Sequence, residues 1–336
     1  MSSDVIRDRA LKGGGRFRKA AIIAAKLLVT GVCFWYLSWQ IDLAQFFSSI
    51  ALLEPGWTAA ATLALTLQIP LVAIRWREIL HVLADDRRLT AASIIAITAI
   101  GAFFTQVLPS LMGEGIRAWL LVRRGYDWRS SVSSVIIDRG VGVAVLLALA
   151  FVILLLPSGL SALGGYRDLV LMIYGALLVA GAGILLFLPR LIAPIERLTY
   201  LRWPVTLAMS ARRVILGPKS FTILALACII HALTITAIWL LGRAQGLLLP
   251  APDAAVLFVV VIGVALVPVS VNGWGLRELA VVAILGRHGI SPEKALAFSV
   301  CFGLLMAIAA LPGALAWLFY SLMPVKRSVR ERECAA

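Results

Sequence analysis

The stretch that decides the fold class is residues 131–156, SVSSVIIDRGVGVAVLLALAFVILLL, which contains a single acidic and a single basic side chain. A helix needs about 20 predominantly apolar residues to cross the roughly 30 Å hydrocarbon core of a bilayer, and this stretch exceeds that length. Stretches of comparable length and character are residues 20–39, 57–76, 169–189, 221–242 and 293–320. The sequence therefore predicts an all-α integral membrane protein.

Composition excludes the common soluble classes. Of 336 residues, 61% are hydrophobic and 14% are charged, against about 25% charged residues in an average soluble domain. Ordinary soluble enzymes and nucleic-acid-binding modules do not fit this balance, although the net charge is +14. The four cysteines, Cys33, Cys228, Cys301 and Cys334, have no paired spacing that indicates disulfides or a zinc site. We expect no metal, no cofactor and no nucleic-acid partner.

Positive charge predicts the topology. Two apolar stretches too short to cross alone run into segments interrupted by Pro and Gly, giving residues 91–122 and 254–286. If both were ordinary crossings, the basic residues in 123–129 and those in 190–219 would lie on opposite sides. If both are re-entrant hairpins, most of the 31 Lys and Arg side chains lie inside, as cytoplasmic loops require. The outside then carries Arg167, Arg243, Arg287 and Lys294.

This topology has six full transmembrane helices, two re-entrant hairpins and both termini in the cytoplasm, in the cell inner membrane. Residues 1–19 form a basic cytoplasmic N-terminus, 20–320 a single polytopic membrane domain and 321–336 a cytoplasmic tail. Arg75 counts among the inside charges, and Trp76 fits an interfacial aromatic belt because it ends an apolar stretch.

The two hairpins share a motif. Residues 113–117, GEGIR, and 273–277, GWGLR, both read Gly-x-Gly-[Ile/Leu]-Arg. The topology gives the surrounding segments, about 57–156 and about 221–320, opposite orientations, so the sequence predicts an inverted repeat. Such repeats with broken helices are typical of secondary transporters, whose substrate site lies at the midplane. The alternative is that Pro and Gly only kink ordinary crossing helices.

Ionisable residues at membrane depth are the main candidates for a site. Each costs roughly 2.5–3.5 kcal/mol at the bilayer centre, so they cannot face lipid unpaired. The set holds three cations and three anions: Glu114, Arg117, Asp138, Arg139, Arg277 and Glu278. We expect them to pair within a hydrated interior.

Helical spacing predicts which of these residues meet. Glu114 and Arg117 are three apart and share a face, whereas Arg139 follows Asp138 directly and must point elsewhere. His231 is interpreted as an interhelical hydrogen-bonding residue. Asp127 is also an expected helix N-cap, and Pro292 the first residue of the last helix. On the helix after the first hairpin, polar residues recur every three or four positions and so line one face as a polar stripe: Asp127, Ser131, Ser134 and Asp138.

Each hairpin is a candidate anion half-site. Its returning arm begins at membrane depth with free backbone N–H groups, and an arginine one turn in offers forked donors for phosphate or carboxylate. We expect the two half-sites to face one anionic group; the alternative is a salt bridge network that only locks the hairpins. The substrate-binding candidates are Glu114, Arg117, Asp138, Arg139, Asn272, Arg277 and Glu278, and the glycines allowing close backbone approach are Gly113, Gly115, Gly273 and Gly275.

At these motifs the sequence resembles the lysylphosphatidylglycerol synthase transmembrane, or flippase-like, family. The resemblance rests on residues 113–121, GEGIRAWLL, residues 137–139, IDR, and residues 273–278, GWGLRE, and covers roughly 20–320. In the family the first motif typically reads Gly-Gly-Asp/Glu-x-x-Arg. Met112, in place of the first glycine, and Trp274 depart from the pattern and could alter hairpin geometry or substrate fit.

The resemblance implies a multi-pass protein that moves an anionic or polar lipid between leaflets, with no catalytic residue. Members that also synthesise aminoacyl lipids carry a large soluble domain, which we do not expect here because the chain ends soon after its last helix. One alternative is an intramembrane enzyme of glycolipid, hopanoid or aminoacyl-lipid biosynthesis, with Asp138 or Glu114 as general base. Another is a scaffold that recruits lipid-biosynthesis enzymes.

Overall fold

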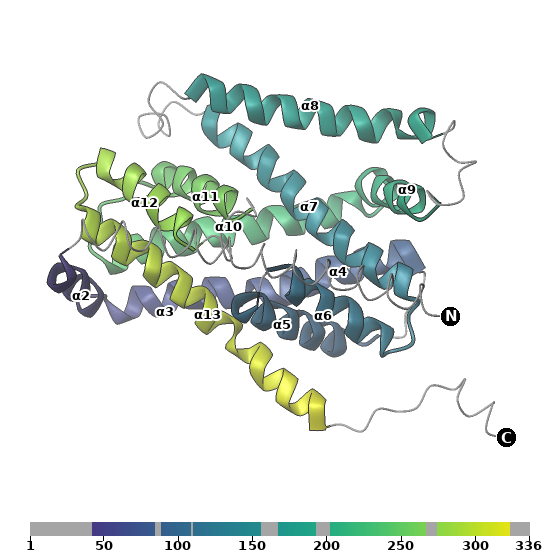
Figure 1. Ribbon diagram of the computed structural model, residues 1–336, viewed down its shortest axis with the longest axis horizontal. Coiled ribbons are helices and arrows are strands. Elements are labelled where there is room, and N and C mark those ends of the chain that lie inside the picture. The colour runs from purple at the N-terminus through teal and green to yellow at the C-terminus, as the bar shows by residue number, and fades with distance from the viewer. Residues whose placement is uncertain are drawn as a thin grey trace, which may run out of the picture. The chain divides into compact units, whose positions relative to one another are not determined.

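The computed structural model describes the chain from Asp42 to Leu322 with several gaps, and every regular element in the described residues is an α-helix (Figure 1). The predicted first crossing, 20–39, both termini, and Asn272 with Gly273 lie outside the described residues. The described ranges are 42–84, 89–108, 110–155, 167–192, 202–266 and 274–322. The helices are α2 (Leu43–Ala51), α3 (Pro55–Thr66), α4 (Gln68–Ala84), α5 (Ala91–Val107), α6 (Ser110–Val122), α7 (Trp128–Leu155), α8 (Arg167–Ile192), α9 (Arg202–Leu216), α10 (Ser220–Ala244), α11 (Ala251–Leu266), α12 (Leu276–Arg287) and α13 (Pro292–Leu322).

Within the described residues, 5 helical segments are long and apolar enough to span a membrane. They are Pro55–Leu83, Trp128–Leu155, Asp168–Arg190, Ser220–Ala244 and Pro292–Phe319. Each coincides with a predicted crossing, so the prediction of a multi-pass helical membrane protein is confirmed at that level. The helices Ala91–Val107 and Ala251–Val264 are apolar but shorter.

The first of these segments differs from its prediction in length and continuity. Instead of one helix over 57–76, the chain forms α3 and α4, which meet at Leu67 and together reach Leu83. Pro70 has no backbone N–H, so the carbonyl of Thr66, four residues earlier, has no helical donor, and the helix breaks there. Helix α4 also continues past Arg75 through buried Ile79 and Leu80, although Arg77 and Glu78 interrupt the apolar sequence.

Helices α5 and α6 pack against each other as a hairpin over the stretch predicted to be one. With 17 and 13 residues, they are about 25 Å and 20 Å long, less than the roughly 30 Å hydrocarbon core. Thr90 caps α5, since its Oγ1 accepts the Ser93 N–H at 3.2 Å. That the hairpin is re-entrant stays a prediction, as does the inverted repeat.

Glycines set the close packing of this hairpin. A Cβ added to Gly113 would meet Thr105 Oγ1, and would lie 2.6 Å from the Thr105 nitrogen and 2.8 Å from the Gly101 carbonyl oxygen. A Cβ at Gly101 would clash with the Arg117 side chain. The close approach that the sequence predicted at Gly113 is therefore made by α5.

Two predicted helix starts are confirmed. The Ser130 N–H donates to Asp127 Oδ2 at 3.1 Å, which makes Asp127 the N-cap of α7. Pro292 is the first residue of α13. Both helices follow a glycine with positive φ, Gly125 at 91° and Gly289 at 74°, a backbone conformation that glycine adopts without steric cost.

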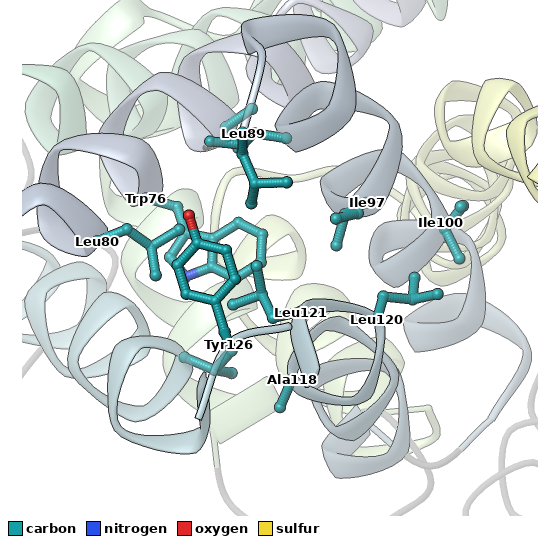
Figure 2. Close-up of a cluster of buried hydrophobic side chains, with 12 residues drawn as sticks. Trp76, Leu80, Leu89, Ile97, Ile100, Ala118, Leu120, Leu121 and Tyr126 are labelled. Atoms are coloured by element: carbon teal, nitrogen blue, oxygen red, sulfur yellow. The ribbon is translucent and has the colours of Figure 1, made fainter. Parts of the chain in front are cut away.

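The chain divides into two compact units, which are described separately. The smaller comprises Met1–Leu52 and Val260–Val300, and the larger comprises Leu53–Val259 and Cys301–Ala336. One core cluster of the larger unit brings together side chains from α4, α5, α6 and α7 (Figure 2). Trp76, Leu121 and Tyr126 lie within it. Trp76 of this core stacks against Arg117, one of the charged residues described next.

Candidate functional site

The centre of the site is Asp138 on α7, which is completely buried. Its Oδ1 accepts from Arg75 Nε at 2.9 Å, and its Oδ2 accepts from Nη1 and Nη2 of Arg117, each at 3.1 Å. Arg75 Nη2 also lies 3.4 Å from the Asp138 carbonyl oxygen. One carboxylate therefore holds two arginines from two other helices, α4 and α6.

Glu114 extends this network along α6. Its Oε2 accepts from Arg117 Nη1 at 2.8 Å, and its Oε1 pairs with Arg139 of α7. The predicted meeting of Glu114 with Arg117 is confirmed, and so is the prediction that Arg139 points away from Asp138. We call the five residues Arg75, Asp138, Arg117, Glu114 and Arg139, in this order of contact, the charge chain.

Arg75 changes the charge balance that the sequence predicted. It is 5% exposed and bonded to Asp138, so it belongs to the buried ionic network, although from the sequence it was counted only among the inside charges. The charge chain holds three arginines and two carboxylates, which gives it a formal charge of +1. Because Arg77, Glu78 and His81 follow Arg75 closely, the local sequence carries no signal that Arg75 is buried.

Trp76 is also misplaced by the sequence interpretation, since it is fully buried and does not lie in an interfacial belt. The guanidinium carbon of Arg117 lies 4.1 Å from the centroid of its ring. Its Nε1 donates to Ser134 Oγ at 3.2 Å, and Figure 2 shows the indole packed among Leu80, Leu121 and Tyr126. Trp76 therefore supports the Arg117 guanidinium through cation–π stacking and a fixed ring position.

The predicted polar stripe on α7 is largely buried. Ser131, Ser134 and Asp138 are each 0% exposed, whereas Asp127 is exposed as the helix cap. Ser134 Oγ donates to the Ser131 carbonyl at 2.8 Å while accepting from Trp76. The stripe thus holds two arginines, Arg75 and Arg117, through the Asp138 carboxylate, and the Trp76 indole through the Ser134 hydroxyl.

His231 of α10 makes the expected interhelical hydrogen bond. Its Nε2 lies 3.0 Å from the carbonyl oxygen of Gly142 on α7, and because a carbonyl only accepts, this nitrogen carries the hydrogen. The Arg75 guanidinium lies beside the same glycine, with Nη1 3.7 Å from the position of an added Cβ. The α10 contact therefore adjoins the buried end of the charge chain.

The second hairpin motif lies in the smaller unit and pairs its own charges. Glu278 is fully buried; its Oε1 accepts from Arg277 Nε at 3.0 Å, from Arg277 Nη2 at 2.7 Å and from Ser299 Oγ at 3.0 Å. Its Oε2 accepts the Gly275 N–H at 2.6 Å. The Arg277 guanidinium lies 4.5 Å from the ring centroid of Trp274. Both motif arginines are thus paired with a carboxylate and stacked on a tryptophan.

The predicted glycines have different surroundings. Gly113 is packed against α5, whereas nothing lies within 4 Å of a Cβ added to Gly115. Gly275 has φ of 89° at the start of α12, a left-handed backbone that favours glycine. That Arg117 and Arg277 face one anionic group stays a prediction. Across the described residues, no cluster of three or more His, Cys, Asp or Glu side chains could hold a metal ion.

Comparison with known proteins places this arrangement in a family. The family described as lysylphosphatidylglycerol synthase TM region matches residues 23–313. The chain belongs to this family. The matched region contains the whole charge chain and the Arg277–Glu278 pair, so every paired charge of the site lies in the membrane region that defines the family.

The chain is also similar to a curated protein, glycosyltransferase AglD of Haloferax volcanii. The two are 30% identical over 158 residues, which is 46% of the chain described here. The match spans only 24% of AglD, about a quarter of its length.

Proposed function

We propose that this member of the lysylphosphatidylglycerol synthase transmembrane family binds an anionic or polar membrane lipid and moves it between the leaflets. The observation that carries the proposal is the charge chain. Three arginines and two carboxylates meet between α6 and two helical segments that are long and apolar enough to span a membrane, namely α3–α4 and α7. The formal excess of one positive charge calls for an anion.

The energetics favour an anionic ligand over a purely structural network. A charge near the bilayer centre costs roughly 2.5–3.5 kcal/mol even on insertion-based scales, and a network with one uncompensated cation keeps part of that cost. Within the described residues, Nε of the buried Arg117 has no hydrogen-bond acceptor. A phosphate oxygen would supply both the missing charge and the missing acceptor, since arginine binds phosphate through forked donors.

Translocation follows if the lipid tails stay in the bilayer while the headgroup occupies the charge chain. In the proposed architecture, α5–α6 and the segment containing α11 and α12 are re-entrant hairpins of an inverted repeat. Arg277 supplies the second half-site, and one repeat rocks against the other to alternate access. The chain lies in the inner membrane with both termini in the cytoplasm.

The experiment is transbilayer movement of fluorescent phosphatidylglycerol in vesicles containing the purified protein. We expect movement with the unmodified protein and a loss of about tenfold or more in the double variant Arg117→Ala, Arg277→Ala, because each change removes charge-assisted hydrogen bonds of about 1.5–3 kcal/mol. The matched control is Arg129→Ala, Arg213→Ala, which changes two exposed arginines. Unchanged movement in a double variant that elutes as a monodisperse protein would refute the site.

A second candidate, an intramembrane enzyme of lipid-linked sugar chemistry, is favoured by the similarity to glycosyltransferase AglD. In that case Asp138 or Glu114 would act as general base while the arginines bind a phosphorylated lipid. Mass spectrometry of purified protein incubated with polyprenyl phosphate and a nucleotide sugar distinguishes the two functions. A new lipid product favours the enzyme, and movement without a product favours translocation.

A further inference from the structure

One end of the charge chain reaches the protein surface at membrane depth. The Arg139 side chain is 57% exposed, whereas those of Glu114 and Arg117 are 11% and 2% exposed. Arg139 lies about 17 Å along α7 from its first residue, by the helical rise of 1.5 Å, in a helix long enough to span the bilayer. Its guanidinium pairs with Glu114, and the exposed part of an arginine side chain at that depth favours a further polar partner over hydrocarbon.

Two exposed glycines lie next in sequence to the members of the Arg139–Glu114 pair. Exposed residues of α6 recur at helical spacing, namely Met112, Gly115, Trp119 and Val122, and those of α7 near the same level are Ile136, Arg139 and Gly140. Each exposed stripe is apolar apart from Arg139 and contains one glycine. Nothing lies within 4 Å of a Cβ added to Gly115 or to Gly140. We call these two glycines the glycine notch.

The glycine notch adjoins the ion pair between the exposed Arg139 and the buried Glu114. Gly115 follows Glu114 and Gly140 follows Arg139, and these two charged side chains are paired with each other. The α6 and α7 helices are packed neighbours. Each helix therefore has an exposed position without a side chain directly after its member of this ion pair.

We infer that a lipid phosphate enters the charge chain laterally from the bilayer at the glycine notch, with Arg139 as its first partner. This inference rests on the proposed function. A phosphate oxygen exchanges with Glu114 on the Arg139 guanidinium, while the acyl chains lie along the apolar stripes of α6 and α7. The single excess positive charge matches a phosphodiester headgroup, which carries one negative charge, better than a monoester, which carries about −1.5 to −2 at pH 7.

The test measures movement of labelled phosphatidylglycerol, a phosphodiester lipid, in vesicles containing the full chain. Arg139→Gln should lower the rate about tenfold, because it replaces the charged donor that first meets the phosphate. Gly140→Leu should cause a loss of similar size by filling the notch. Matched controls are Arg129→Gln, at another exposed arginine of α7, and Gly181→Leu, at a glycine of α8 that also has nothing within 4 Å; both should keep the unmodified rate.

The outcomes separate this inference from the proposed function. If the unmodified protein moves no lipid, the proposed function fails. If it moves lipid but Arg139→Gln and Gly140→Leu match their controls, the lateral entry is refuted. Water-soluble glycerophosphoglycerol at millimolar concentration should not inhibit, whereas competition by it would show entry of the headgroup from water. If phosphatidic acid, a monoester lipid, moves as fast as phosphatidylglycerol, the assignment to phosphodiesters is overturned.

Discussion

Asp138 is completely buried and accepts hydrogen bonds from two arginines on two other helices. Substituting such a carboxylate lowers the stability of the fold more than breaking a surface ion pair does. Removing one partner of a buried pair leaves an uncompensated charge, which costs about 3–5 kcal/mol, whereas exposed pairs contribute about 0–1 kcal/mol. At Asp138 one substitution leaves two arginines short of an anion.

We expect Asp138→Asn to destabilise the fold by about 3–5 kcal/mol, because Arg75 and Arg117 lose the charge they share. In detergent this should lower the unfolding temperature by on the order of 10 °C. Asp127→Asn is the matched control on the same helix, and it should leave the temperature nearly unchanged because asparagine caps helices as well as aspartate does. Equal unfolding temperatures for the two variants would contradict a structural role for Asp138.

The sequence predicted most of the site residues, but it did not predict their partners on α4, Arg75 and Trp76. Glu114, Arg117 and Asp138 stand out because charges are rare at membrane depth, and their spacing shows which ones share a face. Arg75 and Trp76 follow a typical apolar stretch, and both residue types are common at the membrane interface. Their burial depends on packing against α7, which no local pattern in α4 records.

The α5–α6 hairpin is held by close backbone approach. Helices in a membrane gain little from hydrophobic burial, so association depends on van der Waals packing at small residues. Gly101 and Gly113 provide that contact between the two helices. Another glycine, Gly313 of α13, lies so close to the Ala99 carbonyl that an added Cβ would clash with it. Helix α6, which carries Arg117, is therefore held against α5 by close backbone contact.

Substitution of the two glycines of α6 should have opposite results. Gly113→Ala places a Cβ against Thr105 and Gly101, and overpacking of this kind costs about 1–3 kcal/mol. Gly115→Ala meets no atom within 4 Å, and alanine favours a helix over glycine by up to about 1 kcal/mol. Unfolding of both variants in detergent compares them directly. A Gly113→Ala protein as stable as Gly115→Ala would show that the helices do not need the close contact.

At the scale of the whole molecule, the sequence predicted the crossings because length and apolar character decide them. The five described candidate spans all fall on predicted segments. The break between α3 and α4 was missed because Pro is tolerated within transmembrane helices, so Pro70 alone does not show whether a helix bends or stops. Which side of the membrane each loop occupies was predicted only by counting positive charges. This prediction matters most for function at the two hairpins, because it decides whether they are re-entrant.

Cysteine labelling of intact cells tests the topology. In a chain whose native cysteines are replaced, Ala92→Cys in the first turn of α5 and Arg129→Cys after the α5–α6 hairpin should both resist an impermeant maleimide added outside. Leu248→Cys, 91% exposed between α10 and α11, should react, and Arg213→Cys should not. If Ala92→Cys and Arg129→Cys label from opposite sides, α5–α6 crosses the membrane and the re-entrant hairpin is wrong.

The pairing of Arg75 with Asp138 also constrains how the protein is made. The two residues are 63 positions apart, so at roughly 5–20 residues per second Arg75 is synthesised about 3–13 seconds before its carboxylate. During that interval α4 cannot enter lipid without an unpaired cation. The insertion machinery must therefore retain α4 until α7 emerges, and a nascent chain that stalls between them presents an unpaired arginine to membrane quality control.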